Sequence, residues 1–477
     1  MSFPTTGRPA AELLQSLRQR KQHDVPWAEG RVFAYVYDAG PEAMRLIGAA
    51  LDLYKTENGL DPTAFPSLLQ MENEVIGAAI DLMHGGPEAR GSFTSGGTES
   101  ILLSVKTARD WARANKPQIT RPELLLPETA HPAFFKACKY FDVKAVTVPV
   151  DPASYRAVPE RMAAAVSDAT IMMGGSAPSY AHGVIDPIEH LGRIALQRGV
   201  LLHVDCCVGG MVLPFLQRMG VALPRFDLST PGVTQMSVDF HKWGYAGKGA
   251  SCILYRDGDL RRHQIFAWSG WVGYTVINPT VLSTKSGGPL AACWAALNHI
   301  GMDGYLKLVR TTQDAAERLR VGIRALPGLR IVGEPMMNLF SFSSETIDLF
   351  ALAEDMKERG WFIQPQFGFS NSPANIHLSV GASNAPHVEA FLADLADCVR
   401  DARPASAAAP KLPSQALALL AQPMSAALLE QLKAAIGLAG EGLPARMDPI
   451  NHLLNALPAP LRDALLIEYI HDLYRPA

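Results

Sequence analysis

A histidine and a lysine, His241 and Lys242, stand next to each other just after a β-rich run that ends at Asp239. A lysine at the carboxyl end of a strand in an α/β protein points into the crevice where such sheets bind ligands. When an amine is held there and partly desolvated, it can lose its proton and form a Schiff base with an aldehyde. Lys242 is therefore our first candidate for a catalytic residue.

Two other segments supply what an aldehyde cofactor would need. Leu201–Asp205 is an apolar run that ends in a carboxylate, which is the partner of a pyridinium nitrogen. Ser95–Ser100 precedes a helical run and would offer free backbone N–H groups to a phosphate, with Gly96, Gly97 and Thr98 as the candidate ligands. An amine, a carboxylate and a phosphate loop together predict an enzyme that uses pyridoxal 5'-phosphate (PLP).

Each of these segments also has a commoner structural role. A lysine after a strand is usually a solvated surface residue, Asp205 could cap the next helix, and residues 95–98 could form an ordinary tight turn. The order along the chain favours the functional interpretation, because the phosphate loop comes first, then Asp205, then Lys242. The spacing between Asp205 and Lys242 suits a short crossover plus one strand.

The composition is that of an ordinary globular protein. The chain has 477 residues, is 48% hydrophobic and 19% charged, and carries a net charge of −3, which suits a large α/β domain plus a smaller one. The sequence contains no block of lysine and arginine, so we expect no nucleic acid partner. No apolar run approaches the roughly 20 residues that cross a bilayer, and the N-terminus has no secretory pattern. We therefore expect no membrane segment and a cytoplasmic location.

The six cysteines are too few for a disulfide scaffold in a chain of this length, and none has the spacing of a zinc site. We therefore expect no metal ion. Cys206 and Cys207 follow Asp205 directly, and their small side chains are expected to pack beneath the cofactor. We assign them no redox role.

Strands alternate with helices in the central part of the chain. Apolar β-like runs predict strands at 123–126, 143–148, 170–174, 200–205, 234–239 and 251–255. Helical patterns fill the gaps, notably at 132–140, 159–165 and 187–198. This alternation is typical of βαβ units and predicts an α/β protein with a mostly parallel sheet.

We divide the chain into an N-terminal segment (1–60), a large PLP-binding domain (61–300), a smaller α+β C-terminal domain (301–400), and a linker with a helical tail (401–477). The smaller domain is expected to contain strands at 329–332, 337–342 and 376–380 and a helix at 347–359. The Ala/Pro-rich stretch 402–415 indicates the linker, and the last helix is expected at 460–474. Residues 33–66 show little helical periodicity, which indicates a segment that lies over another surface.

The motifs resemble those of the sphingosine-1-phosphate lyases, which are fold-type-I PLP enzymes similar to the group II decarboxylases. The resemblance runs from about residue 31 to about residue 380. It implies PLP fold type I, the aspartate-aminotransferase-like fold, and a homodimer with the active site at the subunit interface. The matching motifs are Thr94–Leu103, His131–Phe134, Gly175–Pro178 with His182-Gly183, His203–Asp205, and His241-Lys242 with Lys248-Gly249.

The resemblance also implies a role for each residue at the cofactor. Lys242 would bind PLP covalently and act in catalysis, and Asp205 would keep the pyridine nitrogen protonated. His131 would stack on the ring and act in catalysis, although a histidine that only satisfies a helix start remains an alternative. The residues that would bind the phosphate are Gly96, Gly97 and Thr98, with Ser237 and His241 as further donors.

The expected substrate is a phosphorylated long-chain base, whose C2–C3 bond would be cleaved to a fatty aldehyde and phosphoethanolamine. Lys248 is the best discriminator, because the lyases have a second lysine there and related decarboxylases an apolar residue. Tyr37 would contact the phosphate or supply a proton, which makes it a third catalytic candidate. The expected substrate-binding residues are Tyr37, Asn58, His182, Lys248 and Lys285.

Three positions depart from the family pattern. Asp61 and Asp38 stand where the lyases have histidines, and Lys285 replaces an arginine and so lacks its two-pronged fork. Because a carboxylate repels a phosphate dianion, either these positions lie away from the phosphate or the substrate differs. The alternative function is a PLP-dependent L-amino-acid decarboxylase. A PLP-fold protein without catalysis is disfavoured, because all the cofactor residues are present.

Overall fold

The computed structural model describes residues 3–405, 427–428, 430–431 and 446–474. The large domain is built on a seven-stranded sheet of order β1-β7-β6-β5-β4-β2-β3. From β6 to β3 the neighbouring strands are parallel, whereas β7 is antiparallel to both β6 and β1. The strands are β1 (Arg90–Thr94), β2 (Glu123–Pro127), β3 (Lys144–Val148), β4 (Thr170–Ser176), β5 (Leu201–Asp205), β6 (Gln235–Asp239) and β7 (Ser251–Tyr255). The predicted mostly parallel sheet is confirmed.

Helices cover both faces of this sheet, because successive residues of a strand point to opposite sides. In β2, Leu124 and Leu126 belong to one apolar cluster and Leu125 belongs to another. Helices α4 and α5 pack on the first face, and α3, α7 and α8 pack on the second. Their bounds are α3 (Pro66–Leu82), α4 (Gly97–Asn115), α5 (Pro132–Phe141), α7 (Ile188–Arg198) and α8 (Leu213–Arg218).

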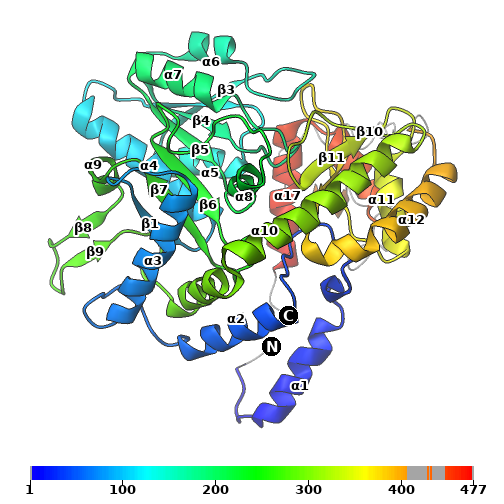
Figure 1. The fold of residues 1–477 in the computed structure, drawn as a ribbon, viewed down its shortest axis with the longest axis horizontal. Coiled ribbons are helices and arrows are strands. Elements are labelled where there is room, and N and C mark those ends of the chain that lie inside the picture. The colour runs from blue at the N-terminus through cyan, green and yellow to red at the C-terminus, as the bar shows by residue number, and fades with distance from the viewer. Residues whose placement is uncertain (1–2, 406–426, 429, 432–445, 475–477) are drawn as a thin grey trace.

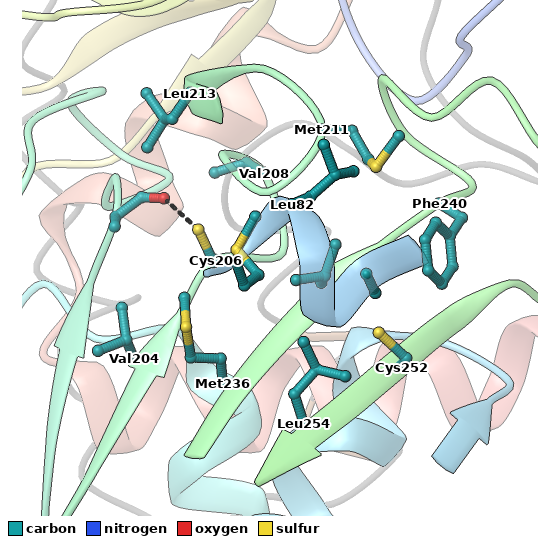
Figure 2. Close-up of a cluster of buried hydrophobic side chains, with 14 of the residues drawn as sticks. Leu82, Val204, Cys206, Val208, Met211, Leu213, Met236, Phe240, Cys252 and Leu254 are labelled. Carbon is teal, nitrogen blue, oxygen red and sulfur yellow. Dashed lines mark hydrogen bonds between the residues drawn. The ribbon is translucent and has the colours of Figure 1, made fainter. Parts of the chain in front are cut away.

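Figure 2 shows part of the core on the second face of the sheet. Val204, Met236 and Leu254 come from three adjacent strands and pack together against α3. Cys206 lies among them, and its thiol donates a hydrogen bond to the carbonyl of Ala177 at 3.2 Å. The cysteine that follows Asp205 is therefore a buried packing residue.

Helix α10 (Gly287–Ala325) runs from the large domain to the small one (Figure 1). It is interrupted at Gly301, whose φ of 59° lies in the region that glycine adopts without strain. The small domain has a four-stranded antiparallel sheet of order β10-β11-β13-β12. Its elements are β10 (Arg330–Ile331), β11 (Leu339–Ser343), α11 (Leu349–Glu358), β12 (Gln364–Gln366), β13 (Asn375–Ser379) and α12 (Val388–Arg400).

The N-terminal segment packs along both domains. Phe33 is fully buried in the small-domain core, where its ring lies 4.9 Å from the ring of Phe391 and 6.2 Å from that of Trp361. Farther along the chain, helix α2 (Pro41–Leu53) lies against α10. The segment thus reaches from the small domain back to the large one.

Helix α2 contradicts the sequence-based expectation for residues 33–66, which showed little helical periodicity. The helix begins with Pro41, whose fixed φ suits the first helical position. Its apolar contacts are made by Ala43 and Ile47, which lie four residues apart and so share one face. This short pattern was hidden by the aromatic and proline residues on either side.

Two helices near the C-terminus, α16 (Asp448–Ala456) and α17 (Ala459–Leu473), pack against the small domain. Leu453, Leu454 and Leu465 form an apolar cluster with Phe367, which follows β12. The helix predicted at 460–474 is confirmed to within one residue at each end. Most of the predicted linker, 402–415, lies outside the described residues.

The remaining elements are mostly peripheral. A two-stranded hairpin, β8 and β9, projects from one edge of the large domain, and α1 projects from the body near the N-terminus (Figure 1). Within the described ranges, no helix is both long and apolar enough to cross a membrane. These elements are α1 (Ala10–Lys21), α6 (Pro159–Ala165), α9 (Gly258–Arg262), β8 (Phe266–Trp268) and β9 (Val276–Asn278).

Candidate active site

A cavity of about 370 Å³ lies where β5 and β6 end and α4 begins. Ligands bind at this edge of an α/β sheet because the loops there leave a crevice beyond the carboxyl ends of the strands. Most of the residues predicted to bind the cofactor meet in this cavity. They are Gly96, Gly97, Thr98, His131, Asp205, His241 and Lys242.

The phosphate loop connects β1 to the start of α4. No described side chain caps this helix start, so its first backbone N–H groups are available to an anion, which the helix dipole also favours. A Cβ atom on Gly97 would lie 2.6 Å from the Cys207 sulfur and 2.9 Å from both carboxylate oxygens of Asp239. Only glycine fits this position, so the backbone itself forms the floor of the cavity.

Asp205 ends β5 and is held from two sides. Its Oδ1 atom accepts a hydrogen bond from the backbone N–H of Cys207 at 3.0 Å and another from the hydroxyl of Ser237 at 3.3 Å. Ser237 is fully buried, and its oxygen also accepts a hydrogen bond from the Cys207 thiol at 3.2 Å. The predicted role of Ser237 as a phosphate donor does not fit this placement, because its hydroxyl supports Asp205 from beneath the cavity.

Half-buried Lys242 forms an ion pair with the buried carboxylate of Asp239, which the sequence did not predict. Its Nζ lies 2.9 Å from Oδ2 of Asp239, whose Oδ1 accepts a hydrogen bond from Ser251 at 2.6 Å. Burial acts to lower the pKa of Lys242, but the Asp239 charge outweighs it and the pKa is raised. The expectation that desolvation would release the proton is therefore wrong for this lysine, because a buried carboxylate lies beside its amine.

The two cavity histidines are both fixed by backbone groups. Nδ1 of His131 accepts the N–H of Ala133 at 3.2 Å, at the start of α5, and Nδ1 of His241 accepts the N–H of Ala250 at 3.2 Å. Burial lowers the pKa of both rings, although Asp205 opposes this at His131 and Asp239 opposes it at His241. A neutral, flat His131 ring on the cavity wall suits a stacking role.

Tyr37 and Lys248 lie together above the Lys242 segment. The Lys248 amine donates a hydrogen bond to the carbonyl of Tyr35 at 2.7 Å and stands 5.0 Å from the centre of the Tyr37 ring. Tyr37 packs edge-on against Trp243 at 4.8 Å. Partial burial and the neighbouring Lys242 charge lower the pKa of Lys248. The N-terminal segment is thus fastened over the cofactor lysine by these two side chains.

Asn58 and Lys285 meet each other but not the cofactor cavity. Oδ1 of Asn58 accepts the backbone N–H of Lys285 at 3.0 Å. The Lys285 amine forms an ion pair with Glu72, whose Oε1 also accepts the N–H of Phe93 at 2.9 Å. The structure therefore places the Lys285 charge beside a carboxylate of its own chain.

His182 lies in a neighbouring cavity rather than beside Lys242. Its ring stacks on Tyr155 at 4.4 Å, and its Nε2 is hydrogen-bonded to the hydroxyl of Ser372 at 2.8 Å. Burial lowers the pKa of His182 to about 4, so its ring is neutral. The predicted substrate contact would have to occur in that second cavity.

The two carboxylates that differ from the family pattern, Asp61 and Asp38, form hydrogen bonds within local turns. Oδ1 of Asp61 accepts hydrogen bonds from the N–H and hydroxyl of Thr63, at 2.9 and 2.6 Å, just before α3. Oδ1 of Asp38 accepts the N–H of Gly40 at 2.8 Å, just before α2. Neither carboxylate lines the cofactor cavity. Both carboxylates therefore form their hydrogen bonds within their own turns.

Sequence reasoning missed two residues of the site. Asp239 pairs with Lys242, and Tyr180 lines the cavity beside His131. Cys207, which was expected beneath the cofactor, does line the cavity. A signal for Asp239 was available, because a carboxylate three positions before a reactive lysine at a strand end can reach its amine. Tyr180 gave no such signal, since a tyrosine in a loop has many structural uses.

Comparisons with known proteins agree with this geometry. A family model described as the pyridoxal-dependent decarboxylase conserved domain matches residues 2–345, and a model for a C-terminal HTH domain of pyridoxal-dependent enzymes matches residues 406–472. A sphingosine-1-phosphate lyase from Arabidopsis thaliana is 38% identical over 81% of this chain and 72% of its own length. The chain belongs to the sphingosine-1-phosphate lyase family.

Other comparisons point to the same family and to its decarboxylase relatives. The solved structure of a sphingosine-1-phosphate lyase from Burkholderia pseudomallei is 35% identical, with a TM-score of 0.81 over 88% of this chain and 97% of that one. A probable L-aspartate decarboxylase from Pyrococcus furiosus is 31% identical over 77% of this chain and 96% of its own length. The protein is therefore a PLP-dependent lyase with the fold of this enzyme class.

The residues of the cavity fit PLP chemically. The glycine floor and the uncapped start of α4 suit its phosphate, Asp205 suits its pyridine nitrogen, and Lys242 suits its aldehyde. The flat His131 ring suits the face of the pyridine. Each expected part of the cofactor thus has a partner of matching charge or shape.

Proposed function

We propose that the protein cleaves the C2–C3 bond of phosphorylated sphingoid bases and releases a fatty aldehyde and phosphoethanolamine. The observation that carries this proposal is the placement of Lys248, whose amine is fastened to the Tyr35 carbonyl above the Lys242 segment. A cation held there can bind the phosphate of a substrate whose amine lies at Lys242. Simple decarboxylation has no evident use for it.

Bound PLP supplies an electron-accepting ring that stabilises negative charge on the substrate carbon next to the amine. Asp205, held by the Cys207 N–H and the Ser237 hydroxyl, keeps a proton on the ring nitrogen. Lys242 holds a proton at Nζ because Asp239 is buried beside it. After the bond has broken, this amine is placed to return a proton to the substrate carbon.

The bond that breaks is the one perpendicular to the cofactor plane, so the contacts at the substrate's ends select it. Lys248 and Tyr37 would hold the phosphate and so turn the C2–C3 bond into that position. We assign Lys285 a supporting role, because Glu72 neutralises its charge and its backbone N–H binds Asn58. A phosphate contact from Lys285 would first require that ion pair to open.

An amino-acid decarboxylase is the second candidate, and it would have to bind an α-carboxylate. Among the described residues that line the cofactor cavity there is no arginine, and the one lysine is Lys242, which is paired with Asp239. His377, which stacks on Tyr180 from the small domain, is neutral because burial lowers its pKa to about 3. Within this described lining, therefore, no unpaired cation is available to an α-carboxylate.

One experiment separates the two functions. PLP-loaded protein is incubated in parallel with phosphorylated dihydrosphingosine and with L-aspartate, the substrate named for the Pyrococcus relative, and assayed for aldehyde and for CO₂. The lyase proposal expects aldehyde from the first and no CO₂ from the second. Release of CO₂ without any aldehyde would instead establish the decarboxylase.

We also propose that the protein works as a homodimer. The β8–β9 hairpin exposes Phe266, Trp268 and Tyr274, and α1 exposes Leu14 and Leu17, which is an unusual amount of apolar surface for two projecting elements. Analytical ultracentrifugation at micromolar concentration should give twice the mass of one chain. A fully active monomer would refute the proposal.

The cytoplasmic location stays a prediction from the sequence. Fractionation of cells that express the chain, followed by immunodetection in the soluble and membrane fractions, tests it.

A further inference from the structure

A second cavity, of about 350 Å³, lies next to the cofactor cavity, and we call it the side chamber. The two cavities share His131 and Tyr180 as wall residues, so these two side chains lie between the chamber and the cavity that contains Lys242. The rest of the wall consists of Glu128–Ala130, Pro132, Val150, Tyr155, Ala181, His182, Gln366, Phe367, Phe369, Ser372 and Asn375.

The exposed wall of the side chamber is mainly carbon. Some of its polar groups are hydrogen-bonded: the hydroxyl of Tyr180 donates to Gln364, behind the wall, at 2.7 Å, and Nε2 of His182 is bonded to Ser372. Thr129 Oγ1, His182 Nδ1 and Asn375 Oδ1 are buried and have no hydrogen-bond partner among the described residues. Glu128 accepts the backbone N–H of Val150 at 3.2 Å. None of the described residues that line the chamber is a lysine or an arginine.

Such a wall favours an uncharged, apolar ligand, because most of its exposed surface is carbon and its three unpaired polar atoms are buried. It would disfavour a phosphate, since it offers no cation and contains the carboxylate of Glu128. Lys248 and Tyr37, the residues proposed for the phosphate, do not line it. The phosphate end and the hydrocarbon end of a phosphorylated long-chain base can thus bind in chemically different parts of the site.

We propose that the side chamber binds the hydrocarbon chain of the substrate. This inference rests on the proposed lyase function and adds to it the subsite that selects the chain. The hydrocarbon chain is attached to C3, one of the two carbons of the cleaved bond. It would pass between His131 and Tyr180 and lie against Tyr155 and Phe369. The aldehyde product would leave from the same chamber.

The far wall of the side chamber is supported by the C-terminal helices. Phe367 belongs to the apolar cluster of α16 and α17, and the Arg462 guanidinium lies 5.0 Å from the centre of its ring. The backbone N–H of Gly368 donates to the side chain of Asn455 at 2.7 Å. The size of the chamber therefore depends on helices that lie far along the chain from the cofactor motifs.

A binding measurement tests the chamber without using turnover. Dodecanol is titrated into the PLP-loaded protein by calorimetry, and the same is done with Ala181→Leu, which adds three carbons to the chamber wall. We expect Ala181→Leu to weaken dodecanol binding by about tenfold, as for the loss of about two buried methylene groups. Ala153→Leu, the same change at an exposed position outside the chamber, should bind like the wild type.

An activity measurement links the chamber to the substrate. The kcat/KM for a long-chain phosphorylated base is divided by that for a truncated base with the same head group, and Ala181→Leu should lower this ratio about tenfold. Phe369→Ala, which removes an exposed wall residue, should lower it by a smaller factor. Unchanged dodecanol binding in Ala181→Leu, or an unchanged ratio, would overturn the inference.

The two proposals fail in different ways. If the wild type cleaves neither base, the lyase function fails, and the dodecanol titrations still decide whether the chamber binds alkyl chains. If the wild type cleaves both bases but Ala181→Leu behaves like Ala153→Leu in both measurements, the lyase function stands and the chamber assignment fails.

Discussion

The cofactor cavity and the side chamber lie next to each other but are built in different ways. The cofactor cavity takes its residues from short motifs at strand and helix ends, such as the loop before α4 and the ends of β5 and β6. The side chamber takes its residues from loops of both domains, and its far wall rests on α16. The residues for the reaction come from short sequence motifs. The proposed binding of the hydrocarbon chain depends instead on packing between segments that are far apart in the sequence.

This difference separates two kinds of mutational effect. A substitution in the cofactor cavity removes a group that the chemistry requires, so it should act on every substrate alike. A substitution at the side chamber should change the ratio between substrates and leave cofactor binding intact. Testing both kinds of variant on the same pair of substrates shows whether the two regions are functionally distinct.

The largest effect is expected for Lys242→Ala. Without this amine the protein has no group that can bind the aldehyde covalently, so activity should be lost on all substrates, by several orders of magnitude. The yellow absorbance of PLP-loaded wild type should disappear, and borohydride should attach PLP to residue 242 in the wild type alone. Activity retained in this variant would overturn the assignment.

A smaller effect is expected for Lys248→Ala. Losing a charge-assisted contact with the phosphate should lower kcat/KM by about one to two decades, since such contacts contribute roughly 1.5–3 kcal/mol. The yellow absorbance should stay, because the Lys242–Asp239 pair is untouched. Lys307→Ala, at a lysine of α10 outside the cavity walls, is the matched control. An equal loss in both variants would show that Lys248 does not bind the phosphate.

A pH effect of intermediate size is expected from His182 in the side chamber. Its pKa is about 4 in the folded protein, below its usual 6.5, so between these values the unfolded chain binds a proton that the folded chain does not. This contribution to stability is complete above pH 6.5 and is lost as the pH falls towards 4. The loss is at most about 1.4 kcal/mol per pH unit.

The variant His182→Gln removes this titration. Its free energy of unfolding, measured by denaturant titration at several pH values, should fall less steeply between pH 6.5 and 4 than that of the wild type. His190→Gln, at an exposed histidine of α7, should keep the wild-type slope. Identical slopes in all three proteins would show that His182 is not buried as a neutral ring.

The sequence predicted most of the large domain, because its strands are apolar runs separated by helical patterns. It also placed Asp205 and Lys242 at the cavity, since Asp205 ends β5 and Lys242 lies three residues after the end of β6. It missed β1, whose Arg90–Thr94 run is short, has Phe93 as its one apolar side chain, and pairs with β7, far along the chain. Pairing between distant segments leaves no periodic signal in either one.

Charge pairing explains the errors at the site. The sequence places Lys242 in a desolvated crevice, which predicts a lowered pKa, but the buried Asp239 carboxylate reverses the sign. Lys285 was read as a free cation, yet the fold brings Glu72 to its amine. Both outcomes depend on which opposite charge lies within reach, and a linear sequence does not show that distance.

The smallest effect is expected for Asn455→Ala, which removes the hydrogen bond that α16 makes to the loop behind the side chamber. One such bond contributes about 0.5–1.5 kcal/mol, so the loop should loosen without unfolding, and the long-to-truncated ratio of kcat/KM should fall by a factor of about two to five. Asn451→Ala, on the same helix and without a hydrogen bond to that loop, is the matched control. If Asn455→Ala instead lowers kcat/KM equally for both bases, the C-terminal helices support the whole active site, and the separation between reaction chemistry and chain binding is wrong.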